Sequence, residues 1–412
     1  MSRAMAMLRE WRVAILLGLA TIGSYGVAQY AIGVLISPIA RETGWSTASL
    51  SAAYAIGVLG GGAGSVLVGR RLDRTGSRAA FLLTLGVGSV LLFASASQRH
   101  PLAFALTWGC GSAAIGAGWF YQATMPATAR SYAGRRTEAF QVLTLLGAFA
   151  SPIFYPLTGA LVGLLGWHDA VRVLVVLMAL LVLPAALTVD ARPAAAAEGK
   201  RKPSIPVRAA LREPTVWRAM LTVALVAAAS GSLILYQVPV MEAAGLTLAA
   251  ASGYGGARGF MQAPARLTLT PLMRRLGLAG SLAAAYAAGA LGAAALLAAL
   301  LLGAPGLFAT VFAVAGGFAI GMQSPLHGLF AIEVCGEERL GTLSGVQQIV
   351  VSVSGAGAPL AVGWMIDASG AYLLPLAAIL VVQVLAIAAL RWQRAATSSD
   401  REVRRRVTAG ER

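Results

Sequence analysis

Charged residues are scarce in this chain of 412 residues. Asp, Glu, Lys and Arg make up 12% of the sequence and hydrophobic residues 58%, whereas soluble proteins carry roughly 25% charged residues. So few charges cannot cover a soluble protein of this size. Apolar runs of about 18 or more residues recur along the whole chain, which is typical of membrane-spanning helices. Most of the surface is therefore expected to face lipid.

Cysteine is nearly absent. Cys110 and Cys335 are expected in the membrane interior and at a cytoplasmic helix end, so we do not expect a disulfide. No CxxC motif or Cys/His cluster indicates a metal site. No Gly-rich ATP motif and no Ser/His/Asp arrangement occurs either. The sequence predicts a protein that is not an enzyme and needs no cofactor.

The apolar runs predict an all-α membrane protein with twelve transmembrane helices in two groups of six. The first run is longer than the core of a signal peptide and lacks a convincing cleavage site, so we expect it to be retained. We expect an N-terminal bundle in 1–190, a cytoplasmic linker in 191–216, a C-terminal bundle in 217–391 and a tail without regular structure in 392–412. The predicted spans are 13–37, 46–67, 79–97, 101–127, 139–164, 169–190, 217–238, 249–272, 280–302, 305–331, 342–365 and 371–391.

Basic residues are distributed unevenly about these spans. The termini, the linker and alternate loops hold nearly all of them, and only Arg41, Arg99 and Arg172 lie in loops on the other side. Cytoplasmic loops of membrane proteins carry an excess of Lys and Arg. This distribution predicts cytoplasmic termini and a bacterial-type inner membrane. It also accounts for the net charge of +16 without a nucleic-acid partner.

The two groups of spans repeat each other. With an offset of 203, Pro156-Leu157 matches Pro359-Leu360. Two parallel six-helix repeats are typical of one transporter architecture, in which the halves rock about a central site. With an offset of 201, the matching pairs are Gly44 and Gly245, Ser46 and Thr247, Arg74 and Arg275, and Gly76 and Gly277.

The loop after the second predicted span reads GRRLDRTGSR. It resembles the cytoplasmic loop motif G-x-x-x-D-R-x-G-x-R of the major facilitator superfamily. The resemblance implies a latch that stabilises one conformation, and a degenerate copy at 273–277 lacks the acidic residue. The matching residues are Gly69, Asp73, Arg74, Gly76 and Arg78.

Within that superfamily, the chain is similar to the monocarboxylate and oxalate/formate transporter group. The similar stretches are 43–50 (TGWSTASL), parts of 132–170 that include YAGRR and GWHDA, and 336–345 (GEERLGTLSG). In that group, an arginine of span 8 lies eight residues before the acidic position of the next loop and holds the substrate anion. The resemblance gives this role to Arg266, because Arg274 stands at the loop position.

Two arginines, Arg258 and Arg266, fall inside predicted span 8. Burying each costs roughly 2.5–3.5 kcal/mol on insertion scales. Eight residues apart, they are expected on one helix face with Gln262 between them. A guanidinium suits a carboxylate, so both are candidate partners of an anionic solute. The alternative is that Arg266 extends towards the cytoplasm or pairs structurally.

Further polar and aromatic residues fall in spans 1, 4, 7 and 10, which line the cavity in the resembled superfamily. His327 is the one imidazole at depth and could couple a proton, or it could simply bond a neighbouring helix. Gln262 stands where some members of the resembled group carry an Asp, so proton coupling through a buried carboxylate is not supported. The other candidates are Tyr25, Gln29, Tyr121, Gln122, Tyr236, Gln237 and Gln323.

These observations predict a monomeric secondary transporter that moves a small organic anion, monocarboxylate-like, by alternating access. A coupling proton (symport) or a counter-anion (antiport) would supply the energy. An exporter of drugs or amphipathic metabolites is the first alternative. A transport-inactive sensor is the second, although the sequence shows no signalling domain.

Overall fold

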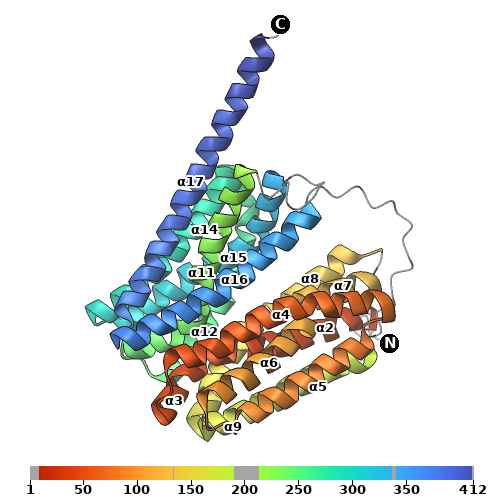
Figure 1. The fold of residues 1–412 in the computed structure, drawn as a ribbon, viewed down its shortest axis with the longest axis vertical. Coiled ribbons are helices and arrows are strands. Elements are labelled where there is room, and N and C mark those ends of the chain that lie inside the picture. Colours follow the sequence, from red (N-terminus) through yellow and green to blue (C-terminus); the bar gives the residue numbers. More distant parts are fainter. Residues whose placement is uncertain (1–8, 133, 190–212, 336–339, 411–412) are drawn as a thin grey trace.

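Every element of the described chain is helical. The computed structural model describes residues 9–132, 134–189, 213–335 and 340–410 (Figure 1). Lipid offers no partner to backbone N–H and C=O groups, so a spanning segment must satisfy them internally, as a helix does. The predicted all-α class is confirmed.

The first half consists of six spans, several of them bent or broken. Span 1 is α2 (Arg12–Tyr25), the π-helical turn η1 (Gly26–Ala31) and α3 (Ile32–Thr43). The others are α4 (Thr47–Thr75), α5 (Arg78–Ser95), the broken pair α6 (Pro101–Trp119) and α7 (Tyr121–Ser131), α8 (Arg136–Gly147), and α9 (Ala150–Thr188), which Gly166 divides in two.

The second half repeats this plan. It begins with α11 (Pro214–Ala243), followed by the broken series α12 (Leu248–Phe260) and α13 (Gln262–Leu267). The next helices are α14 (Leu269–Leu302), which bends at Gly277, α15 (Pro305–Cys335), α16 (Leu340–Ser369) and α17 (Leu373–Gly410). The tail was expected to lack regular structure, but α17 continues through it to Gly410.

The helices account for the predicted spans. Nine helical stretches in the described chain are long and apolar enough to cross a membrane, and one of them, Arg136–Thr188, joins two predicted spans. The remaining two predicted spans, 101–127 and 249–272, are interrupted at Phe120 and Met261.

The repeat seen in the sequence has a structural counterpart. Gly44 and Gly245 have φ of 70° and 102°, and Gly76 and Gly277 have φ of 87° and 67°. A side chain is strained at such positive φ, so glycine is required at both copies of each turn. The caps also correspond, because Ser46 accepts a hydrogen bond from Ser49 N and Thr247 accepts one from Ala250 N, each 3.2 Å long.

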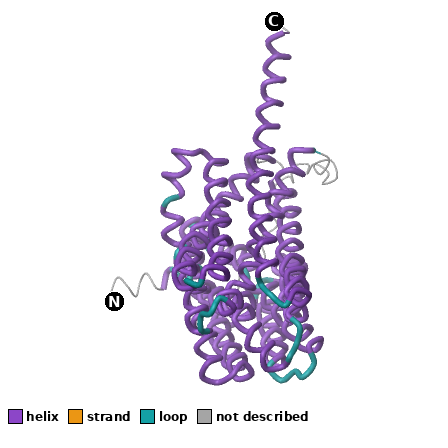
Figure 2. The backbone as a smooth tube through the Cα atoms, turned by 90° about the vertical axis from the view of Figure 1, so that its left-hand side faces the viewer, coloured by secondary structure: helices purple, strands orange, loops and turns teal. Residues whose placement is uncertain are grey.

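The two halves touch at one end and diverge at the other. In Figure 1, α4, α7 and α8 of the first half separate from α15 and α16 of the second towards the end where α17 leaves the bundle. Figure 2 shows the tail leaving the bundle at this end along α17. We call this end the linker side and the opposite end the closed side.

Helices α9 and α12 pack closely across the contact between the halves, as α4 and α16 also do. Gly256 of α12 lies so near α9 that an added Cβ would come within 2.9 Å of Pro156 Cδ and 3.1 Å of the Pro152 carbonyl oxygen. Tyr155 of α9 donates a hydrogen bond to the Ile234 carbonyl of α11, 2.8 Å long. Small residues allow membrane helices to approach in this way.

Hydrogen bonds complete the closed side. Arg41 pairs with Glu242 at 3.2 Å, and Ser51 bonds the hydroxyl of Tyr236. The Asp367 carboxylate of α16 accepts hydrogen bonds from the backbone N–H groups of Thr47 (2.8 Å) and Ala48 (2.9 Å). These are first-turn amides of α4, which have no partner within their own helix, so Asp367 caps a helix of the other half.

Candidate functional site

The main cavity lies between the two halves. It has a volume of about 360 Å³, and its walls come from α2, η1, α4, α6 and α7 of the first half and from α11, α15 and α16 of the second. Because the halves diverge beyond it, the cavity lies where alternating access places a solute.

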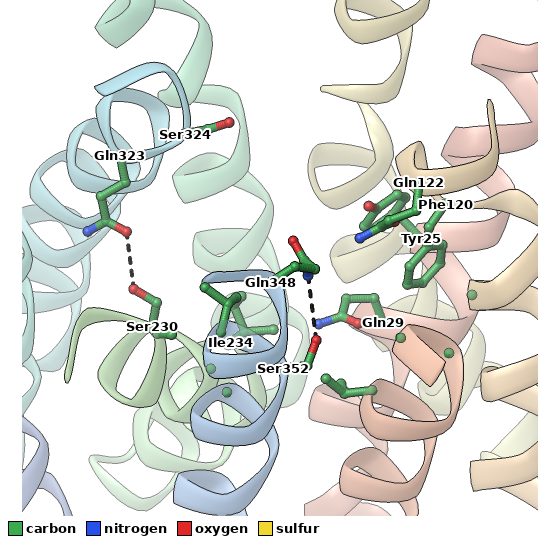
Figure 3. Close-up of a pocket in the computed structure, with 18 of the residues that line it drawn as sticks. Tyr25, Gln29, Phe120, Gln122, Ser230, Ile234, Gln323, Ser324, Gln348 and Ser352 are labelled. Atoms are coloured by element: carbon green, nitrogen blue, oxygen red, sulfur yellow. Dashed lines mark hydrogen bonds between the residues drawn. The ribbon is translucent and has the colours of Figure 1, made fainter. Parts of the chain in front are cut away.

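Amides and hydroxyls supply the polar groups of this cavity (Figure 3). Ser230 donates to Gln323 Oε1 at 3.2 Å, and Gln348 lies 3.5 Å from Ser352 Oγ. Gln29 donates to the Tyr54 hydroxyl at 2.8 Å. Each of these side chains retains further donors or acceptors. The wall can therefore form several hydrogen bonds to a solute.

Aromatic rings cover the first-half wall of the cavity. Tyr25 stacks on Phe120 with ring centroids 3.9 Å apart and lies 5.3 Å from the ring of Tyr121. Tyr30 lies behind this group, 5.4 Å from Tyr155. The break between α6 and α7 at Phe120 turns this ring towards Tyr25. This wall can pack against the apolar part of a solute.

Arg258 is deeply buried at the contact between the halves. Its exposed fraction is 4%. Its Nη1 donates to Gln237 Oε1 at 2.9 Å, and its guanidinium lies 5.2 Å from the centre of the Phe312 ring. Arg258 Nε and Gln237 Nε2 have no hydrogen-bond partner. No carboxylate of the described chain pairs with this cation.

Arg266 has different surroundings. Its side chain is exposed, and it lies close enough to Tyr30 and Tyr121 of the first half to interact electrostatically with their hydroxyls. Arg266 therefore lies near the first half, but it lines neither the main cavity nor the smaller cavity that contains Arg258. The helix break at Met261 lies between the two arginines, of which Arg258 is buried and Arg266 exposed, although both lie within electrostatic range of Tyr30.

His327 reaches the cavity from α15. Its Nε2 lies 2.8 Å from the Tyr286 hydroxyl of α14, which is completely buried. The imidazole thus has one nitrogen in a hydrogen bond and one edge towards the cavity. It is the histidine that the sequence places at depth.

The remaining predicted site residues divide into two groups. Tyr25, Gln29, Gln122, Gln323 and His327 line the main cavity. The others lie around it, because Tyr121 packs behind Tyr25, Tyr236 bonds Ser51 and the Pro359 carbonyl on the closed side, Gln237 bonds Arg258, and Gln262 lines a second, smaller cavity with Arg258.

Several wall residues were not among the predicted site residues. Tyr54, Ser230, Ser324 and Ser352 line the cavity, but Ser and Tyr are frequent in membrane helices and give no distinctive signal. The clearest signal was in α4, where Gly57, Gly61 and Gly62 repeat at helical spacing and form part of the wall.

The loop motif lies on the linker side, at the end of α4. Gly76 makes the turn with φ of 87°, and Arg74 and Arg78 are exposed. Arg130 of α7 donates to the Leu72 carbonyl at 3.0 Å, which ties the end of α4 to the neighbouring span. Gly69 lies within α4, about two turns before Gly76. The side chain of Asp73 lies outside the described part.

Replacing Asp367 with alanine is expected to weaken the closed side. A lost helix cap costs about 1 kcal/mol, so the linker-side-open population should fall about fivefold relative to the opposite state. Spin labels at Glu42 and Ala243, in a chain without Cys110 and Cys335, measure the distance between the halves on the closed side. In Asp367→Ala, a larger share of the molecules should show the longer distance.

The matched control is Asp169→Ala. Asp169 lies on the same side, and its one ion-pair partner among the described residues is Arg172 of its own half, at 2.6 Å. An unchanged label distance in Asp367→Ala, or an equal change in both variants, would contradict the role given to Asp367.

The fold is that of known transporters. The chain superimposes on the crystal structure of the nucleoside transporter NupG with a TM-score of 0.77 and 14% identity, covering 93% of this chain and 98% of that one. The bacterial homologue of the human lysosomal transporter Spinster, in an inward-facing and occupied conformation, gives 0.73 and 16%, covering 93% and 97%. At these identities the likeness concerns the fold alone. No curated protein matches the sequence.

A family model decides the classification. The model of the Major Facilitator Superfamily matches residues 17–359, a range that includes most of both halves and the cavity between them. The chain therefore belongs to the Major Facilitator Superfamily and is a multi-pass membrane transporter.

Proposed function

We propose that this transporter is a secondary carrier that moves a small, monocarboxylate-like organic anion across a bacterial-type inner membrane by alternating access. The observation that carries the proposal is the charge at the centre of the molecule. Arg258 is buried beside the main cavity, and Arg266 lies within electrostatic range of Tyr30 and Tyr121 of the other half. The described cavity wall itself contains no Asp, Glu, Lys or Arg. In a low-dielectric surrounding, uncompensated positive charge attracts an anion.

In this proposal, different side chains bind different parts of the solute. Arg266, which lies within electrostatic range of Tyr30 and Tyr121, would hold the carboxylate, since a guanidinium can bind it with two hydrogen bonds. The amides of Gln29, Gln122 and Gln323 would bind the polar remainder, and Tyr25 its apolar part. His327 is the group available to carry a coupling proton, and exchange against a second anion is the other coupling mode.

The proposed orientation places the linker side in the cytoplasm. The arginines of the loop motif, the linker and the tail support this orientation through the positive-inside rule. The described conformation would then be open to the cytoplasm, and one chain contains the whole cavity, which supports a monomer.

Competition for uptake tests the solute class. In proteoliposomes containing the purified protein, a labelled short monocarboxylate such as lactate should accumulate and be displaced by other short carboxylates. An uncharged nucleoside or an amphipathic cation should not displace it. Displacement by these compounds alone would overturn the anion assignment and leave the carrier assignment intact.

A second candidate is an exporter of uncharged or amphipathic compounds. The observation in its favour is the neutral wall of the main cavity, which combines glutamine amides with the rings of Tyr25 and Phe120. In that case the two arginines would stabilise the fold and would not bind the solute. In the competition assay, the nucleoside or the amphipathic cation would displace the labelled compound, and short carboxylates would not.

A further inference from the structure

A second cavity lies beside the main one, at the contact between the halves. Its volume is about 30 Å³, and both halves line it. Tyr30, Ser151 and Tyr155 come from the first half, and Arg258 and Gln262 come from the second. This space admits one water or one small ion and excludes an organic solute.

The wall of this cavity carries a positive charge without a counter-charge. Arg258 is only 4% exposed, and its one protein hydrogen bond goes to a neutral amide, Gln237 Oε1. Tyr30 and Tyr155 carry phenols, which ordinarily ionise only near pH 10, and Ser151 and Gln262 are neutral. A buried cation normally has an ionic partner, and the described chain does not provide one.

A small anion supplies the negative charge that balances Arg258, whereas a water molecule does not. Water satisfies a hydrogen-bond donor but leaves the charge unbalanced in a medium of low dielectric constant. An anion of halide size fits the volume and can accept hydrogen bonds from the guanidinium and from the hydroxyl of Tyr30 or Ser151. The Tyr155 hydroxyl already donates to the Ile234 carbonyl. We propose that Arg258 forms a binding site for a small monovalent inorganic anion such as chloride, separate from the solute cavity.

The position of the site links anion binding to conformation. Its walls are η1 and α9 on one side and α11, α12, α13 and α15 on the other. These two sets of helices must part when the closed side opens. An anion that binds only the assembled site stabilises the linker-side-open state by its differential affinity. Chloride would therefore act as an effector of the transport cycle. This inference goes beyond the proposed function, because it holds whichever solute the main cavity carries.

Thermal unfolding of the purified protein tests the site directly. The full chain is dialysed into sodium gluconate and titrated with sodium chloride or bromide at constant ionic strength, so that general screening does not change. Tryptophan fluorescence should show a saturable rise in Tm of a few degrees. The rise should be absent from Arg258→Gln and retained in Arg266→Gln. A Tm independent of halide, or a rise that persists in Arg258→Gln, would overturn the proposal.

Two further measurements complete the test, one with the variant Tyr30→Phe and one with sodium formate. Tyr30→Phe removes one hydroxyl from the cavity wall and should weaken halide binding about tenfold, so the site remains testable if Arg258→Gln does not fold. Sodium formate tests the carboxylate source. If formate raises Tm and halides do not, the cavity holds the end of a transported carboxylate and the separate inorganic site is wrong. No measurement here requires transport, so failure of this inference is distinguishable from failure of the proposed function.

Discussion

Replacing Arg266 with glutamine is expected to abolish uptake of the organic anion at low concentration. Hydrogen bonds to a charged group contribute about 1.5–3 kcal/mol, so the half-saturation concentration should rise roughly 10- to 150-fold. Arg266 is exposed and has no carboxylate partner among the described residues, so its loss leaves no buried charge unpaired. Folding should remain intact. Arg266→Lys keeps the charge but loses the planar pair of donors, and it should retain part of the uptake.

Arg274→Gln is the matched control. Arg274 lies eight residues further along the chain, in α14, and is also exposed. Unlike Arg266, it is not among the groups that interact electrostatically with Tyr30 and Tyr121. Its replacement should leave the half-saturation concentration unchanged. Uptake in proteoliposomes, corrected for the amount of folded protein by size-exclusion chromatography, measures both variants. Wild-type kinetics in Arg266→Gln would show that the solute does not use this guanidinium.

The architecture could be predicted because each of its determinants is local in the sequence. A span requires an apolar run, and a turn with positive φ requires glycine. The offset of 201 therefore identified Gly76 and Gly277 as equivalent turns, and both have positive φ. The interruptions at Phe120 and Met261 were not predicted, because membrane helices tolerate breaks wherever neighbouring helices or side chains satisfy the freed backbone groups.

The site was predicted less completely, because burial depends on partners far away in the chain. Spacing gave Arg258 and Arg266 a common face, but the break at Met261 left one enclosed and the other exposed. Similarly, Gln237 lies in a predicted cavity-lining span, yet it is completely buried against Arg258. The packing of the whole bundle decides which side of a helix faces the cavity. The composition of a single helix does not reveal that side.

Replacing Gly256 with leucine is expected to shift the protein away from the linker-side-open state, because Gly256 lies in the contact between α9 and α12. A Cβ at Gly256 would come within 2.9 Å of the Pro156 ring and 3.1 Å of the Pro152 carbonyl oxygen. Neither the rigid ring nor the backbone can give way easily, so the two helices must move apart. Overpacking of this kind costs about 1–3 kcal/mol. Because the strain exists only when the halves touch on the closed side, it should shift the equilibrium away from the linker-side-open state by roughly 5- to 150-fold.

Gly253→Leu is the control for that shift. Gly253 is on the same helix, but it is exposed and has no atom within 4 Å of an added Cβ. Labels at Glu42 and Ala243 should show the longer closed-side distance in Gly256→Leu alone, and uptake should fall with it, since a carrier held in one state cannot complete its cycle. If Gly256→Leu transported at the wild-type rate with an unchanged label distance, α9 and α12 would not form the contact that closes the molecule. Because the cavity of Arg258 lies in the same contact, chloride should restore part of the short-distance population in Gly256→Leu if the anion site persists there.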